Sequence, residues 1–339
     1  MRVLLRVDAG AEFGLGHFTR SLALAQALRQ SHAACTFLTT PKAQARVEQA
    51  GCDFVSLDAV APGSQADLEK TCATAREKQC AVVVVDSYRI GADFLAGLRA
   101  ANLYVVMIDD LAAFPFPCHM VVNGSIYADA KKYISAKGDT QFLLGAEYIL
   151  LREEFWNVAP PLLKQRVQNI LLLLGGSDAL NLMPRLIQEL DPLKGDFQIT
   201  AVMGPFFENR NEVEHAAANA QRRVELAVNP TEQRKLILNA DLAISAGGQT
   251  IHELLVCGCP TLALAIAENQ VPNVHGWAER GAVRAVAGTG RDISFEDISC
   301  QTQDLLESYE MRSSLRANGR RWIDGLGARR VAEAILKWN

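Results

Sequence analysis

The sequence predicts an α/β protein built from two doubly wound halves, and three observations support this prediction. Short runs rich in β-branched residues or leucine alternate with longer amphipathic segments, a pattern typical of βαβ units on a parallel sheet. The alternation breaks once, at 156–161, where consecutive prolines can continue neither a helix nor a strand ladder. A glycine turn also stands between a strand and a helix in each half, at 14–17 and at 246–250.

The elements follow in order from this pattern. In the first half the expected strands are 2–7, 35–39, 54–57, 81–85, 103–108 and 120–123, and the clearest helices are 17–30, 65–78 and 92–101. In the second half the expected strands are 169–174, 197–203, 223–228, 241–245, 260–265 and 283–286. Its expected helices are 179–190, 207–220, 231–239, 249–257 and 270–280, and the tail from about 293 to 337 has a helical pattern. We expect an N-terminal domain at 1–155, a C-terminal domain at 168–320, and a helix within 321–339 that packs back across the linker.

Composition narrows the class of protein. The 339 residues are 49% hydrophobic and 21% charged, enough for about two globular cores. The net charge is -4 and no block of like charge is present, which disfavours nucleic acid and anionic membranes as partners. The longest apolar runs have the length of strands, so we expect no transmembrane helix and a cytoplasmic protein. Eight cysteines without a CxxC pair predict reduced thiols, and Cys257 and Cys259 lack nearby partners for a zinc site.

The first candidate site is the glycine turn that contains Gly14, Gly16 and His17. It follows the strand at 2–7 and opens the helix at 17–30. Glycine lets a ligand approach the backbone, and the positive end of a helix disfavours an imidazolium. We therefore expect a neutral His17 that accepts a proton near neutral pH, the property of a general base. A capping or solvated histidine is the alternative.

Carboxylates gather at the predicted strand ends of the first half. These are Asp8, Asp86, Asp109 and Asp110. They lack the spacing and the phosphate-binding partner of a magnesium site, so we expect them to cap loops, orient His17 or bind a substrate hydroxyl, with no metal. Tyr88 follows the same strand end as Asp86 and is expected at the same mouth, or at its rim as a packing aromatic.

The second half repeats the glycine-turn arrangement twice. Gly175, Gly176 and Ser177 follow one strand, and Gly247, Gly248, Gln249 and Thr250 follow another. Backbone amides at a helix start, approached over glycine, bind phosphate without lysine. Glu253, one turn further on, is positioned to accept both hydroxyls of a ribose. Asn269 and Gln270 come after the next strand, where a sugar or diphosphate would emerge, although Asn269 has helix capping as an equal alternative.

A dinucleotide cofactor is not expected. The glycine turn at 14–19 lacks the third glycine of the fingerprint, and the strand at 35–39 ends without the acidic residue that binds a ribose. The sequence therefore predicts a small-molecule nucleotide ligand without a cofactor.

In their order along the chain, these segments resemble the UDP-sugar hydrolases of the pseudaminic acid pathway, members of the GT-B superfamily related to the peptidoglycan N-acetylglucosaminyltransferase. The matching segments are 6–9 with 14–17, 85–88, 108–111, 122–123, 145–148 with 151–155, 174–178, 240–253 and 268–270. The resemblance implies a GT-B fold, in which two Rossmann-like doubly wound domains face a central cleft. Phe18 and Thr19 after the histidine depart from the aliphatic residues usual there, and Asn229 to Thr231 depart from an expected methionine-containing loop.

The resemblance also implies an activity. It is the hydrolysis of UDP-2,4-diacetamido-2,4,6-trideoxy-β-L-altropyranose by water at the anomeric carbon, for pseudaminic acid and surface glycans such as glycosylated flagellin. His17 would activate the water, Tyr88 and Asn269 would position the substrate, and Asp8, Gly14 and Gly16 would line the sugar side. The turn at 247–250 would hold the diphosphate, Glu253 the ribose, and the backbone near Met203, Gly204 and Asn229 the uracil. Two alternatives stay open: an inverting glycosyltransferase that uses the same base on an acceptor hydroxyl, and a non-catalytic sugar-nucleotide sensor.

Overall fold

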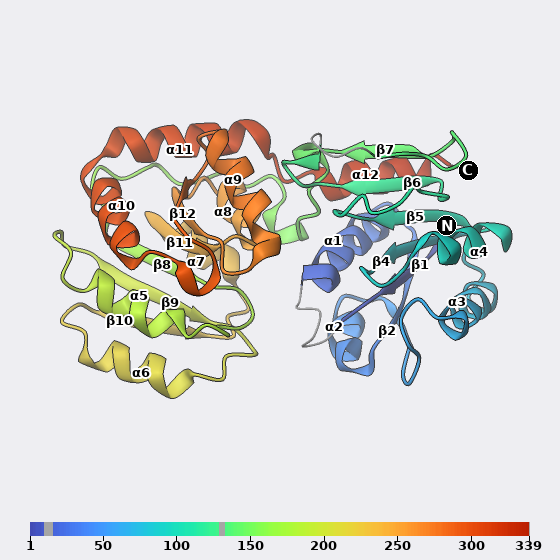
Figure 1. The fold of residues 1–339 in the computed structure, drawn as a ribbon, viewed down its shortest axis with the longest axis horizontal. Helices are drawn as coiled ribbons and strands as arrows, with labels where there is room; N and C mark the ends of the chain where they lie inside the picture. The colour runs from blue at the N-terminus through green and yellow to red at the C-terminus, as the bar shows by residue number, and fades with distance from the viewer. Residues whose placement is uncertain (10–15, 129–132, 339) are drawn as a thin grey trace. The chain divides into compact units, whose positions relative to one another are not determined.

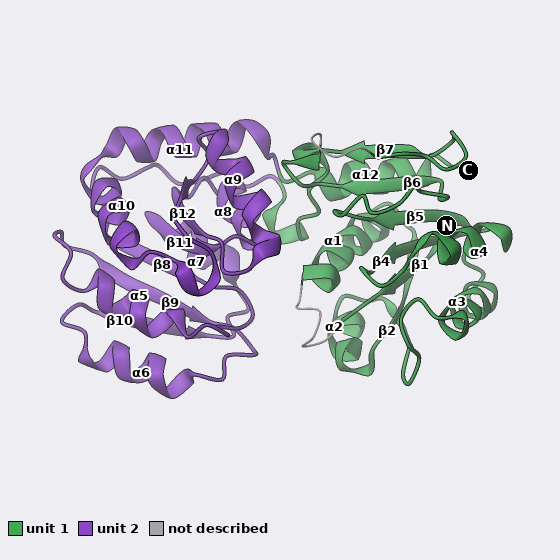
Figure 2. Cartoon of the chain, viewed as in Figure 1, with its two compact units in different colours: residues 1–156, 325–339 green, residues 157–324 purple. Residues whose placement is uncertain are grey.

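The computed structural model describes residues 1–9, 16–128 and 133–338, which form two compact units (Figures 1 and 2). Unit 1 comprises residues 1–156 and 325–339, and unit 2 comprises residues 157–324. The last helix of the sequence therefore belongs to the same unit as the first strand.

Unit 1 contains a parallel seven-stranded sheet in the order β3-β2-β1-β4-β5-β6-β7. Its strands are β1 (Arg2–Val7), β2 (Ala34–Thr39), β3 (Asp53–Ser56), β4 (Val82–Asp86), β5 (Tyr104–Ile108), β6 (Met120–Asn123) and β7 (Gln141–Leu144). Its helices are α1 (Gly16–Gln30), α2 (Gln44–Gln49), α3 (Gln65–Glu77), α4 (Ala92–Ala100) and α12 (Gly327–Leu336), with short 3-10 turns at Pro41–Ala43, Ala146–Tyr148 and Glu153–Phe155. The strand order reverses beside β1 and β4, which is where doubly wound sheets bind their ligands.

Alternation along β1 determines which side chains meet which helices. Val3, Leu5 and Val7 join the apolar cluster formed with α1, α2 and α12, whereas Leu4 joins the cluster with α3 and α4 on the other face. Arg6 is fully buried on that second face, where its guanidinium pairs with Asp67 of α3 at 2.6 Å and with Asp8 at 2.6 Å. A charge in this position is tolerated because both carboxylates neutralise it.

Unit 2 contains a parallel six-stranded sheet in the order β10-β9-β8-β11-β12-β13. Its strands are β8 (Asn169–Leu173), β9 (Gln198–Met203), β10 (Val224–Val228), β11 (Leu242–Ala246), β12 (Thr261–Leu264) and β13 (Arg284–Ala285). Its helices are α5 (Leu182–Leu190), α6 (Arg210–Asn219), α7 (Gln233–Leu238), α8 (Thr250–Val256), α9 (Val271–Glu279), α10 (Phe295–Glu307) and α11 (Tyr309–Trp322), with 3-10 turns at Glu268–Gln270 and Gly290–Asp292. Helices α5, α6 and α10 share one apolar cluster with the sheet.

Some elements differ from the prediction. The strand β7 was not expected, and no bounds were predicted for the helix α2, because both are short and neither carries a clear apolar period. The helical tail is three helices, interrupted at Ser308, whose side chain caps α11, and again at 323–326. No helix in the described part of the chain is long and apolar enough to cross a membrane.

Candidate active site

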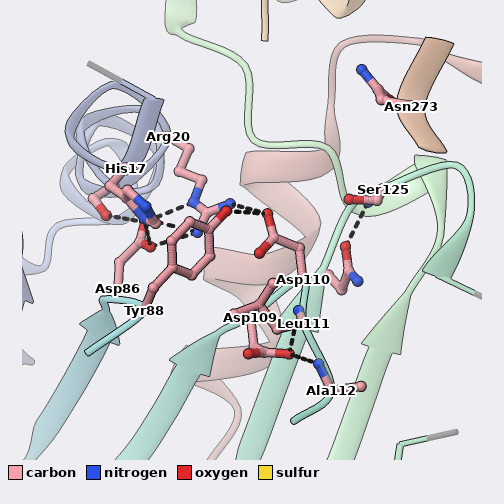
Figure 3. A network of polar contacts seen from close by, with 12 residues as sticks. His17, Arg20, Asp86, Tyr88, Asp109, Asp110, Leu111, Ala112, Ser125 and Asn273 are labelled. Atoms are coloured by element: carbon pink, nitrogen blue, oxygen red, sulfur yellow. Dashed lines mark hydrogen bonds and ion pairs between the residues drawn. The ribbon is translucent and has the colours of Figure 1, made fainter. Parts of the chain in front are cut away.

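His17 and Asp86 meet at the carboxyl end of the sheet in unit 1. Asp86 is the last residue of β4, and His17 lies in the first turn of α1, the helix that follows the neighbouring strand β1. The Nδ1 atom of the histidine lies 2.5 Å from Oδ1 of Asp86, and both side chains are buried (Figure 3). The expectation that a strand-end carboxylate orients His17 is confirmed for Asp86.

Asp86 is also the centre of a larger ionic cluster. Arg20, one turn after His17 on α1, donates from Nε to Oδ2 at 2.8 Å and from Nη2 to Oδ1 at 2.6 Å, and Ser21 donates to Oδ2 at 3.0 Å. Burial acts to raise the pKa of Asp86, but the charges of Arg20 and His17 outweigh it and hold that pKa well below its ordinary value. Asp86 is therefore a carboxylate at any pH at which the protein works.

An ionised Asp86 determines the tautomer of His17. A carboxylate only accepts hydrogen bonds, so Nδ1 must carry the hydrogen that faces Oδ1. In the neutral ring the lone pair then resides on Nε2, the atom turned away from Asp86. This arrangement is the one a general base requires.

Tyr88 and Asp110 complete the cluster. The Tyr88 ring meets the His17 ring edge to face with centroids 4.4 Å apart, and its hydroxyl donates to Oδ2 of Asp110 at 2.9 Å (Figure 3). Arg20 donates to the same Asp110 oxygen at 3.2 Å. Burial and the charge of Asp110 raise the pKa of Tyr88, so its phenol stays protonated. Tyr88 is 47% exposed although its ring contacts the buried imidazole.

The other expected residues of unit 1 have different positions. Asp8 is buried with one oxygen on Arg6 and the other accepting from Ser87, so it holds the loop after β4. Asp109 accepts hydrogen bonds from the amides of Leu111 and Ala112 and so caps its own loop, which is one of the roles expected for these carboxylates. Gly16 is exposed at the start of α1, and Gly14 lies outside the described residues. A sugar contact from Asp8 stays a prediction.

The first glycine turn of unit 2 does not end in a free helix start. Gly175 has a φ of +91°, and Ser177 is exposed. However, the carboxylate of Asp178 accepts from the amides of Leu182 and Met183, the first residues of α5, at 2.8 Å each. The expectation of free amides at this helix start is therefore wrong, because an aspartate already caps them. Only the turn itself remains available to a ligand.

The second turn, at 247–250, is tied to the chain that follows β12. The amide of Gly247 donates to the carbonyl of Leu264 at 2.7 Å and to Oε1 of Gln270 at 3.0 Å. That amide is occupied, whereas a side chain at Gly248 would meet only Nε2 of Gln270, at 3.8 Å, so the backbone at this residue is open to a ligand. Gln270 thus shapes the turn.

The remaining candidates of unit 2 lie at the end of β9, in α8 and in the 3-10 turn before α9. Glu253 is buried and its Oε2 accepts from Gln233 at 2.7 Å, while Met203 is buried at the end of β9. Asn269 is exposed in the 3-10 turn before α9, and no side chain caps that helix, so the capping alternative for Asn269 is not observed. Gly204 follows β9 and packs against the turn at 175–176.

Several polar residues of these clusters were not predicted. They include Arg20, Ser21 on α1, Gln233 and Asn273, which donates to the carbonyl of Gly247 at 2.8 Å. Arg20 had a signal, because position i+3 from His17 lies on the same helix face. The partners of Gln233 and Asn273 are separated from them by 20 and 26 positions, which spacing along one element does not show. Among the described residues no three His, Cys, Asp or Glu side chains are grouped as a metal site.

Comparison with known proteins finds relatives of low sequence identity. No protein-family profile matches it. The spore coat polysaccharide biosynthesis protein SpsG of Bacillus subtilis is 27% identical, over 99% of this chain and 98% of that protein. The UDP-2,4-diacetamido-2,4,6-trideoxy-beta-L-altropyranose hydrolase of Campylobacter jejuni is 22% identical, over 83% of this chain and 97% of that protein.

Solved structures establish the fold. The crystal structure of MurG from Acinetobacter baumannii aligns with a TM-score of 0.72 and 16% identity, over 99% of this chain and 100% of that one. The chain therefore has the architecture of GT-B glycosyltransferases, with a seven-stranded and a six-stranded parallel sheet. The fold prediction is confirmed in these terms.

Proposed function

We propose that this protein is a metal-independent UDP-sugar hydrolase that releases UDP from UDP-2,4-diacetamido-2,4,6-trideoxy-β-L-altropyranose, in the synthesis of pseudaminic acid. The observation that supports it most directly is the pairing of His17 Nδ1 with Asp86 at 2.5 Å, which leaves Nε2 as a base. The similarity to the Campylobacter jejuni hydrolase over most of both chains supports the substrate.

In the proposed reaction His17 takes one proton from water at Nε2. The water oxygen forms a bond to the anomeric carbon while the bond from that carbon to the phosphate oxygen breaks, and UDP leaves with the bonding electrons. Attack from the side opposite UDP inverts the anomeric centre. Asp86 stabilises the imidazolium that forms, as a carboxylate does behind a catalytic histidine. Tyr88 and Asn269 would position the sugar.

The leaving group would be held by unit 2. Backbone amides of the turns at 175–177 and 248–250 would meet the diphosphate, and Glu253 would accept the ribose hydroxyls, exchanging its contact with Gln233. Main-chain dipoles are fixed before the reaction and need no reorganisation as charge develops on UDP.

The test measures UDP release from this UDP-sugar without an acceptor, in the presence of EDTA, with the anomeric product followed by NMR. His17→Gln should lose at least about a hundredfold in kcat, the range for a general base, while calorimetry shows UDP binding close to wild type. His32→Asn is the matched control, because His32 is exposed and has a φ of +62°, which asparagine tolerates. Full turnover by His17→Gln would contradict the mechanism.

A glycosyltransferase is the second candidate, since the structures that share this fold include glycosyltransferases such as SpnG. It would use the same base on an acceptor hydroxyl. UDP release only after an acceptor is added would favour it over the hydrolase. UDP binding without turnover on any UDP-sugar would instead favour a sensor.

A further inference from the structure

Arg20 forms the most extensive ion pair within reach of the proposed base. Its Nε and Nη2 atoms contact the two oxygens of Asp86 at 2.8 and 2.6 Å, the side-by-side geometry of a guanidinium on a carboxylate. Its Nη2 atom also lies 3.0 Å from Nδ1 of His17. The imidazole therefore faces a carboxylate that is already paired with a cation.

This pairing matters because a carboxylate alone stabilises the protonated imidazole. The attraction between opposite charges is stronger inside a protein than in water, so this stabilisation is substantial. An imidazolium produced in this way cannot take a proton from water. A cation at a similar distance destabilises the protonated imidazole by a similar amount, so it offsets the effect of the carboxylate.

We propose that Arg20 is a positioning residue that keeps His17 unprotonated at neutral pH by neutralising Asp86, while leaving that carboxylate free to hold the ring. This inference rests on the proposed function only for the role of His17 as the base. Two molecular tasks are thus separated. Asp86 determines which nitrogen carries the hydrogen, and Arg20 removes the electrostatic bias towards the charged ring.

Other charged or titratable groups surround this pair. Among the described residues, the charged or titratable groups around His17 and its partners include Asp86 on β4, Arg20 on α1, Tyr88 after β4, Asp110 after β5, and Tyr127, which interacts electrostatically with Arg20 and Asp110. Asp110 pairs with the Nη1 atom of Arg20, so it holds the guanidinium from the side away from the imidazole. Arg20 is the cation of this group.

The test follows the proton on the ring directly, without substrate. The Cε1–H resonance of His17 is titrated by NMR in the full chain labelled with ¹³C-histidine, and it is assigned with His17→Asn. Arg20→Gln should move the titration midpoint of this resonance up by about one pH unit or more, because Asp86 is left unbalanced. Asp86→Asn should move the midpoint down, because Arg20 then faces the ring alone. Arg20→Lys should keep it near wild type.

Two further variants separate a shift of the His17 titration midpoint from a general loss of stability. Arg46→Gln is the matched control, since Arg46 is exposed on α2 of the same unit. The double variant Arg20→Gln/Asp86→Asn leaves no member of this pair buried and unbalanced, and its midpoint should fall below that of Arg20→Gln. A merely structural Arg20 would lower thermal stability without shifting the midpoint. Equal midpoints in wild type, Arg20→Gln and Asp86→Asn would overturn the inference.

Activity separates this inference from the proposed function. In the hydrolase assay the acidic limb of kcat/KM should shift with the NMR midpoint in each variant. Opposite NMR shifts in a protein that never releases UDP would reject the hydrolase and keep the role of Arg20. Turnover that depends on His17, together with a titration midpoint that no Arg20 or Asp86 variant moves, would keep the hydrolase and reject the role of Arg20.

Discussion

The side-chain oxygen of Gln270 accepts a hydrogen bond from the backbone amide of Gly247 at 3.0 Å, across 23 positions of sequence. The same oxygen accepts from the amide of Ile266 at 3.2 Å. One amide side chain thus joins the turn after β11 to the segment after β12. The shape of the proposed diphosphate turn depends on this bridge.

Substitutions of Gln270 should distinguish the effect of the shape of the turn at 247–250 from the effect of a negative charge beside the phosphates. Gln270→Ala loses both hydrogen bonds and should lower the free energy of unfolding by about 1–2 kcal/mol, with weaker UDP binding. Gln270→Glu retains an acceptor oxygen and should unfold close to wild type, yet its negative charge beside the phosphates should weaken UDP binding at least as much. Thermal unfolding and calorimetry with UDP measure the two effects. Wild-type UDP affinity in Gln270→Glu would show that the nucleotide binds elsewhere.

Two glycines of unit 2 should respond differently to alanine. A Cβ on Gly204 would lie 2.6 Å from the carbonyl oxygens of Gly175 and Gly176, so the backbone must move, and we expect a loss of about 1–3 kcal/mol of stability. A Cβ on Gly248 meets only Nε2 of Gln270, at 3.8 Å, so Gly248→Ala should fold normally. It should still lose about tenfold in UDP affinity, because the methyl group occupies the face offered to the phosphate.

Gly91→Ala is the control for this pair, since a Cβ there meets nothing within 4 Å. Chemical unfolding and UDP calorimetry on the three variants provide the comparison. Unchanged UDP binding by a folded Gly248→Ala protein would contradict the proposed phosphate contact.

The stability of the protein should depend on pH through His252. This side chain is buried in α8, and burial lowers its pKa to about 4. Between pH 6.5 and pH 4 the unfolded chain binds a proton that the folded chain does not, so stability falls as the pH falls through this range. From pH 7 to pH 5 the loss should be about 2 kcal/mol from this residue.

Urea unfolding at the two pH values measures this contribution of His252. His252→Gln should show a smaller difference than wild type, because glutamine does not titrate. His275→Gln, at an exposed position of α9 in the same unit, should keep the full difference. An identical pH dependence in His252→Gln and wild type would mean that other groups dominate.

The fold could be predicted where hydrophobic periodicity was strong. The strand Val82–Asp86 is buried along its whole length, and its valine run shows this in the sequence. The strand Gln141–Leu144 was missed because it is short and half-exposed, and only pairing with β6 makes it a strand. Tertiary contacts of this kind have no local signal.

The candidate site was predicted to a similar extent. The meeting of His17 with Asp86 follows from the rule that parallel strands end at one edge, so residue type and position sufficed. The competition for hydrogen bonds could not be predicted in the same way. Whether Asp178 or a ligand occupies the first amides of α5, or whether Gln270 occupies the amide of Gly247, depends on distances that sequence spacing does not contain.

The return of α12 to unit 1 has a consequence for how the protein is made. Ala328, Val331 and Ile335 of this helix complete the apolar cluster that covers α1, the helix that carries His17. A ribosome synthesises all of unit 2 between these two partners. The N-terminal half therefore emerges with one side of α1 uncovered, and it reaches its final packing only after unit 2 and α12 have been synthesised.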